Sequence, residues 1–117
     1  MSDETQVILR PVRRFSASDL GQHIRQHHPN CPKTVRKALI RRIVAKPWVN
    51  ANMGTAVGIT IENYLRHEVS GYDNLLRLGI ERDQARTLIR PQIDLILAIW
   101  KRSRELSGAS RHGELKT

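Results

Sequence analysis

The sequence predicts an all-α protein: a small multi-helix domain with a basic N-terminal arm and a disordered C-terminal tail. The chain has 117 residues, enough for one hydrophobic core but not for two. Several segments repeat apolar residues at the spacing of an amphipathic helix, and proline, glycine and capping residues separate these segments. We therefore expect a basic extended arm (1–15), a single helical domain (16–106) and a flexible tail (107–117).

The first fifteen residues show no helical period. The basic residues Arg10, Arg13 and Arg14 surround Pro11, a composition that suits an extended arm. A short edge strand fits the same residues, because proline is tolerated at the edge of a sheet. Both structures stay open for this segment.

The first helix should begin at a serine cap, either Ser16 or Ser18, and should end near His28, because a proline follows at once. The second helix should occupy residues 33–46, with Pro32 at its start, where a missing amide proton costs nothing. Its apolar residues recur on one side, which predicts an amphipathic helix with one buried face.

A loop is expected over residues 47–54, followed by a third helix over about 55–69. Ser70 stands three residues before Asp73, which resembles a capping box at the start of a fourth, short helix. That helix should stop at Gly79, because glycine adopts the left-handed conformation that ends many helices.

The longest helical pattern runs from Glu81 to about Leu106. Leu95 and Ile99 widen its apolar stripe, so we expect this helix to be buried on several sides. Pro91 removes one amide donor and should kink or break the helix.

The charge balance predicts a polyanionic partner. Twenty Lys and Arg residues against eleven Asp and Glu residues give a net charge of +9. Residues 1–50 hold ten of the basic residues and three of the acidic ones, so the excess lies in the first half. Nucleic acid, an anionic membrane surface and an acidic protein are the classes of partner that such a charge attracts.

The location of the protein is predicted from its cysteine content and its hydropathy. A single cysteine, Cys31, excludes an internal disulfide and suits a reducing compartment. The first residues lack the basic and apolar regions of a secretory signal. The longest apolar run, residues 95–100, is far shorter than a bilayer span. We expect a soluble, cytoplasmic protein without a membrane partner.

Motifs for catalysis and for cofactors are missing. The chain has no glycine-rich phosphate loop, no nucleophile elbow and no His-Glu-x-x-His motif, so neither an enzyme nor a cofactor is expected. His23, His27 and Cys31 have a spacing that could present three ligands to zinc. A proline interrupts the helix before Cys31, and no fourth ligand is near, so we expect no metal site.

The segment RHEVSGYDNLL, residues 66–76, is followed by Arg82, Arg86 and Trp100. This pattern resembles the uncharacterised family called domain of unknown function 2293, over about residues 55–102. Ser70 stands where members of the family carry threonine, and it keeps the hydroxyl group. The family has no established function, so the resemblance implies none, and it gives no support to residues 1–50.

Two interpretations fit the Arg-His pair in this segment. Arg66 and His67 lie in the last turn of the predicted third helix, where cations complement the exposed carbonyl groups. We favour this structural role, with Ser70 and Asp73 as caps of the next helix. In the alternative interpretation, Arg66 and His67 contact phosphate groups.

The predicted second helix carries a basic stripe opposite its apolar side. Residues 33–46 contain no Asp or Glu, so no ion pair can form one turn away within the helix. A row of unpaired like charges costs stability, which favours a polyanion as partner. The nucleic-acid-binding residues predicted from this stripe, the arm and the Arg-His pair are Arg10, Arg13, Arg14, Lys33, Lys37, Arg41, Arg42, Lys46, Arg66 and His67.

The sequence therefore predicts a protein that binds DNA or RNA, chiefly through phosphates and with weak sequence specificity. The alternative is a non-enzymatic regulatory or adaptor protein that docks on another protein. The apolar width of the last helix could serve such docking, or a homodimer. Salt dependence distinguishes the two functions, because nucleic-acid affinity falls steeply with salt whereas apolar docking does not.

Overall fold

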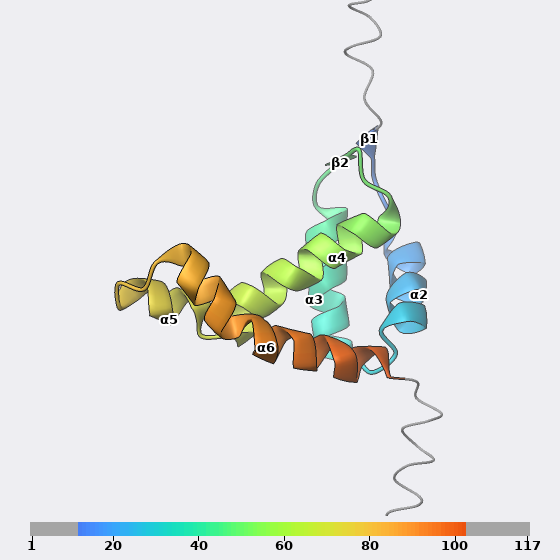
Figure 1. The fold of residues 1–117 in the computed structure, drawn as a ribbon. Coiled ribbons are helices and arrows are strands. Elements are labelled where there is room, and N and C mark those ends of the chain that lie inside the picture. The colour runs from blue at the N-terminus through green and yellow to red at the C-terminus, as the bar shows by residue number, and fades with distance from the viewer. Residues whose placement is uncertain (1–11, 103–117) are drawn as a thin grey trace, which may run out of the picture.

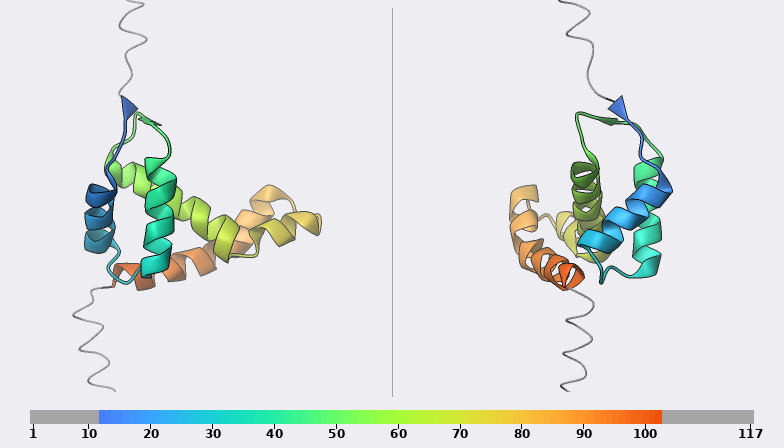
Figure 2. Two further views of the ribbon diagram at one scale, coloured as in Figure 1. Left: turned by 180° about the vertical axis from the view of Figure 1, so that it is seen from behind. Right: turned by 90° about the vertical axis from the view of Figure 1, so that its right-hand side faces the viewer.

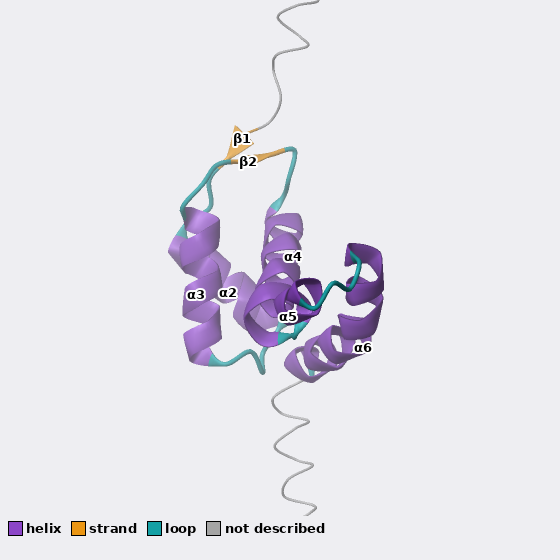
Figure 3. Ribbon diagram, turned by 90° about the vertical axis from the view of Figure 1, so that its left-hand side faces the viewer, coloured by secondary structure: helices purple, strands orange, loops and turns teal. Residues whose placement is uncertain are grey.

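The computed structural model describes residues 12–102 and confirms the small all-α fold. Helices α2, α3 and α4 form a body in which α3 packs against both neighbours (Figure 1). Helix α5 and the start of α6 project from this body, and the rest of α6 returns along it (Figures 1 and 3). In chain order the elements are β1 (Val12–Arg13), α2 (Ala17–His27), α3 (Lys33–Val44), β2 (Trp48–Val49), α4 (Met53–Tyr64), the π-helical turn η1 (Leu65–Val69), α5 (Tyr72–Arg77) and α6 (Arg82–Lys101).

The core is mainly aliphatic and follows the helical period of the sequence. Each long helix contributes apolar residues four positions apart, which share one face. The main-chain carbonyl of Trp100, near the end of α6, accepts a hydrogen bond of 3.0 Å from the amide of Asn30. This bond ties the end of α6 to the turn between α2 and α3. Fully buried core residues include Leu20, Ile24, Leu39, Ile43, Val57, Ile61, Leu65 and Ile93.

Some helix ends follow the expected chemistry, but α3 ends at Val44 rather than at residue 46, and α6 ends at Lys101 rather than near residue 106. The hydroxyl of Ser16 caps α2 by accepting a 3.1 Å hydrogen bond from the amide of Asp19. Helix α4 begins two residues before the predicted range, because Asn52 Oδ1 accepts a 2.8 Å hydrogen bond from the amide of Thr55. Gly79 has a φ of 89°, which confirms the predicted left-handed stop after α5.

The described part of the arm is a two-residue strand. Val12 lies opposite Val49 and Arg13 opposite Trp48 in an antiparallel pair, so the predicted loop over 47–54 contains β2. The sequence allowed either an extended arm or an edge strand here, and Val12 and Arg13 form the edge strand. Arg10, the rest of the arm before residue 12 and the predicted tail lie outside the described residues.

Helix α6 differs from its prediction. It continues through Pro91 without a break, and its axis bends (Figure 1). The expected burial on several sides is wrong, because Leu95 is 62% and Ile99 42% exposed. The body, η1 and α5 together cover only one of the faces of α6, the face that carries Ala85 and Ile93. None of the described helices combines the length and the hydropathy needed to cross a bilayer.

Candidate nucleic-acid interface

The exposed side of α3 presents a row of three basic residues, Lys33, Lys37 and Arg41. They are spaced one turn apart, so they point to the same side of the helix. Leu39 and Ile43 are fully buried on the other side, which fixes the rotation of α3 about its axis. None of the three basic residues forms an ion pair with another described residue. We call them the α3 row.

Arg42, unlike the residues of the α3 row, has an acidic partner. Its Nη2 lies 3.2 Å from Oε2 of Glu68 in η1, and its guanidinium carbon lies 5.1 Å from the ring centroid of Tyr64. The expectation that the basic stripe lacks acidic partners is therefore wrong for Arg42. Helix α3 contains no acid, but its packing against α4 brings Glu68 within reach.

The end of α3 and the arm meet at Trp48. The indole Nε1 of Trp48 donates a 3.1 Å hydrogen bond to the carbonyl of Ile43, which holds the ring against the end of α3. The ammonium of Lys46 lies 4.2 Å from the ring centroid of Trp48, in a cation–π contact that leaves its charge in place. Because Arg13 pairs with Trp48, the strand pair brings the arm close to Lys46. Arg13 and the neighbouring Arg14 are both exposed.

The Arg-His pair has partners within its own corner of the fold. His67 Nδ1 lies 3.0 Å from Asp73 Oδ1, and the His67 ring meets the Tyr72 ring edge-on at 5.5 Å between centroids. Arg66 lies 5.8 Å from the centroid of Tyr72 and donates a 3.4 Å hydrogen bond to Asn63 Oδ1. These partners are side chains of the same corner rather than the helix carbonyls expected from the sequence, and both interpretations of Arg66 and His67 stay open.

The predicted capping box is wrong. The chain makes a π-helical turn before Ser70, whose amide donates to the carbonyl of Leu65 five residues back. The Ser70 hydroxyl donates to the carbonyl of Arg66 and accepts a 3.2 Å hydrogen bond from the amide of Tyr72. Asp73 is thereby left to pair with His67 rather than to reach back to the Ser70 amide.

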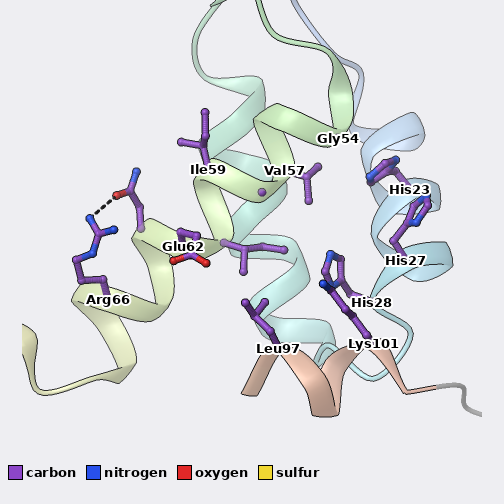
Figure 4. Close-up of a pocket in the computed structure, with 13 residues that line it drawn as sticks. His23, His27, His28, Gly54, Val57, Ile59, Glu62, Arg66, Leu97 and Lys101 are labelled. Carbon is purple, nitrogen blue, oxygen red and sulfur yellow. Dashed lines mark hydrogen bonds between the residues drawn. The ribbon is translucent and has the colours of Figure 1, made fainter. Parts of the chain in front are cut away.

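The predicted site residues do not all gather on one face. In Figure 4, Arg66 extends from the near side of the chain, whereas α3 lies behind α4. The α3 row lies on α3. Arg13 lies in the strand pair at the end of α3, and Arg14 and Lys46 lie in the chain next to that pair. Arg66 and His67 belong to the separate corner after α4.

His23, His27 and Cys31 do not form a common ligand set. The rings of His23 and His27 lie 4.3 Å apart, but Cys31 is buried and its Sγ lies 3.7 Å from the carbonyl oxygen of Pro32. Burial raises the pKa of the Cys31 thiol to about 11, which disfavours the thiolate that a metal would bind. Within residues 12–102, no three His, Cys, Asp or Glu side chains are grouped to hold a metal ion.

Sequence reasoning missed Glu68 and Trp48 as neighbours of the basic residues. Glu68 lies 26 positions after Arg42, so a search for partners along one helix cannot find it. Trp48 follows Lys46 by two residues. An aromatic residue so close to a lysine was a local signal for a cation–π contact.

Fold and site together define a small helical domain with a basic face. Residues 23–101 match the family described as uncharacterized conserved protein (DUF2293), and the chain belongs to this family. The match begins in α2 and reaches the last residue of α6, so it includes α3, which the sequence-based resemblance over 55–102 left out. No curated protein and no solved structure matches the chain.

Proposed function

We propose that this protein binds nucleic acid, DNA or RNA, without enzymatic activity, and that it does so in the cytoplasm. The observation that supports the proposal is the α3 row, Lys33, Lys37 and Arg41, which is exposed and has no acidic partner among the described residues. Neighbouring members of the row stand about 6 Å apart along the helix axis, so all three can face one phosphate backbone.

The residues beside the row extend the same positive surface. Lys46, Arg13 and Arg14 lie at the end of α3, where the strand pair joins the arm to it. Exposed lysine and arginine side chains contact the phosphates of a nucleic acid. Phosphates carry no sequence information, so binding should be weakly sequence-specific. Arg42 contributes less than its neighbours, because Glu68 offsets its charge.

A double charge reversal in the row tests the function. Lys37→Glu with Arg41→Glu should lower duplex or single-strand affinity at least tenfold. It should also flatten the log–log salt slope by about 2, since each phosphate contact contributes about 0.9. Both side chains are exposed, so the fold should survive.

A matched control separates a localised site from net charge. Arg82→Glu with Arg86→Glu reverses two exposed charges one turn apart on α6, in the part that projects away from α3 (Figure 1). This variant should keep most of the affinity. Equal losses in the two double variants would leave net charge as the sole cause and would refute a site on α3.

A second candidate function is docking on another protein, as a regulatory or adaptor protein. It is favoured by Leu88, Leu95 and Ile99, which are 61%, 62% and 42% exposed. At 3.6 residues per turn they fall within about 40° of one another around α6. A pull-down with and without nuclease, repeated at high salt, distinguishes the candidates, because apolar docking survives both treatments.

A further inference from the structure

A cleft of about 790 Å³ opens between α2, α4 and the end of α6 (Figure 4). Seen from behind, α3 lies in front of α4 (Figure 2), so the cleft and the α3 row occupy different faces of the body. The cleft is therefore independent of the surface proposed to bind nucleic acid.

His28 forms part of the cleft wall where α2 ends. Its Nδ1 is buried and has no hydrogen-bond partner among residues 12–102. A buried N–H without an acceptor is rarely tolerated, so the neutral ring should carry its proton on Nε2. Burial, and then the charge of Lys101, lower the pKa of His28 to about 4, so the ring is neutral near pH 7. Nε2 can then donate a hydrogen bond to an oxygen atom of a ligand.

The charged groups of the cleft favour an anion. Lys101 lies beside His28, and Arg66 stands at the other end (Figure 4). Glu62 also lines the cleft, but its two oxygens each lie 3.1 Å from the guanidinium of Arg90. This bidentate pair compensates the carboxylate, so the basic side chains determine the sign of the local field.

The floor of the cleft is apolar and has free space. Val57, Ile61 and Leu97 line it between the charged ends. Gly58 lies among them, and a Cβ atom at this position would meet nothing within 4 Å. A ligand seated here would have an apolar surface along its body and hydrogen-bond donors at one end.

We propose that this cleft binds a small organic anion. A phosphate or carboxylate head group contacts Lys101 and His28, and an apolar body packs against Val57, Ile61 and Leu97. Binding sites for small molecules commonly combine such an apolar lining with a few convergent polar groups. The proposal needs no nucleic-acid binding and would survive the loss of that function.

Titration of the full chain with two probes, 1-naphthyl phosphate and decanoate, tests the proposal, with imidazole NMR signals and calorimetry as readouts. At least one probe should bind stoichiometrically and shift the His28 signals, whereas inorganic phosphate, which lacks a body, should bind at least tenfold more weakly. The probe that binds more tightly distinguishes a planar from an aliphatic ligand. Failure of both probes to bind would overturn the proposal.

Two substitutions localise the binding. Gly58→Leu fills the open space, so it should lower the affinity for the probe at least tenfold, while the melting temperature of the protein stays equal or rises. Lys101→Gln should lower the affinity for the probe at least fivefold. Lys37→Gln makes the same charge change on the α3 row and should leave this affinity unchanged. Unchanged affinity in Gly58→Leu, or equal losses in the two lysine variants, would refute a site in the cleft.

Discussion

Arg42 and Glu68 connect α3 to the π-helical turn, with 3.2 Å between Arg42 Nη2 and Glu68 Oε2. The two side chains are 44% and 50% exposed, so the ion pair contributes at most about 1 kcal/mol to stability. The ion pair matters more for the charge of the basic face than for the stability of the fold. Glu68 holds one negative charge beside a helix that contains no acid of its own.

Removing that charge should strengthen nucleic-acid binding. In Glu68→Gln, Arg42 becomes free to contact phosphate, so affinity at low salt should rise by about threefold and the salt slope should steepen by up to about 0.9. Fluorescence anisotropy over a salt series measures both quantities. Asp94→Asn is the control, because it removes the same charge from an Arg90 pair on α6. An equal rise in this control would contradict a local role of Glu68.

Local sequence signals were sufficient to predict most of the helices. A serine cap at Ser16 or Ser18, of which Ser16 is the observed one, and a stop at Gly79 were predictable because both depend on a few neighbouring residues. The exposure of Leu95 and Ile99 was not predictable in this way. An apolar residue on a helix shows that it could be buried, but not whether another element reaches it.

The candidate site was predictable where it depends on one helix alone. The α3 row follows from the helical period of residues 33–46. The pairing of Asp73 with His67 depends on the π-helical turn, which changes the register of the chain before Ser70. The cleft depends on three helices that meet in space, and no spacing in the sequence encodes its walls.

Ser70 should stabilise the corner without taking part in binding. Its hydroxyl satisfies the amide of Tyr72 and the carbonyl of Arg66, so Ser70→Ala should lower the free energy of unfolding by about 1 kcal/mol. Nucleic-acid affinity should stay unchanged. Urea unfolding and a binding titration on the same variant test both statements. A large loss of affinity at unaltered stability would instead assign Ser70 to a binding site.

Cys31 should be unreactive in the native protein. The residue is 4% exposed, and burial raises the pKa of its thiol to about 11, so the thiolate is scarce near pH 8. A disulfide reagent such as dithiobisnitrobenzoate should label Cys31 at the rate of unfolding and should label it fully in denaturant. Rapid labelling of the native protein, at a rate independent of added urea, would contradict the burial of this thiol.

His28 should make the protein less stable in acid. Burial lowers its pKa from 6.5 to about 4 in the folded state, so the folded protein resists protonation that the unfolded chain accepts. The stabilising contribution of the neutral ring is complete above about pH 6.5 and is lost progressively as the pH falls toward 4. His28→Gln keeps a neutral polar side chain at every pH and so removes the pH dependence that comes from His28. Urea unfolding at pH 7.5, 5.5 and 4.5 should therefore show a smaller loss of unfolding free energy in His28→Gln than in the wild type.

Carboxylates titrate in both proteins, so the difference between the two curves of unfolding free energy against pH isolates His28. Parallel curves would show that its ring is not buried as described.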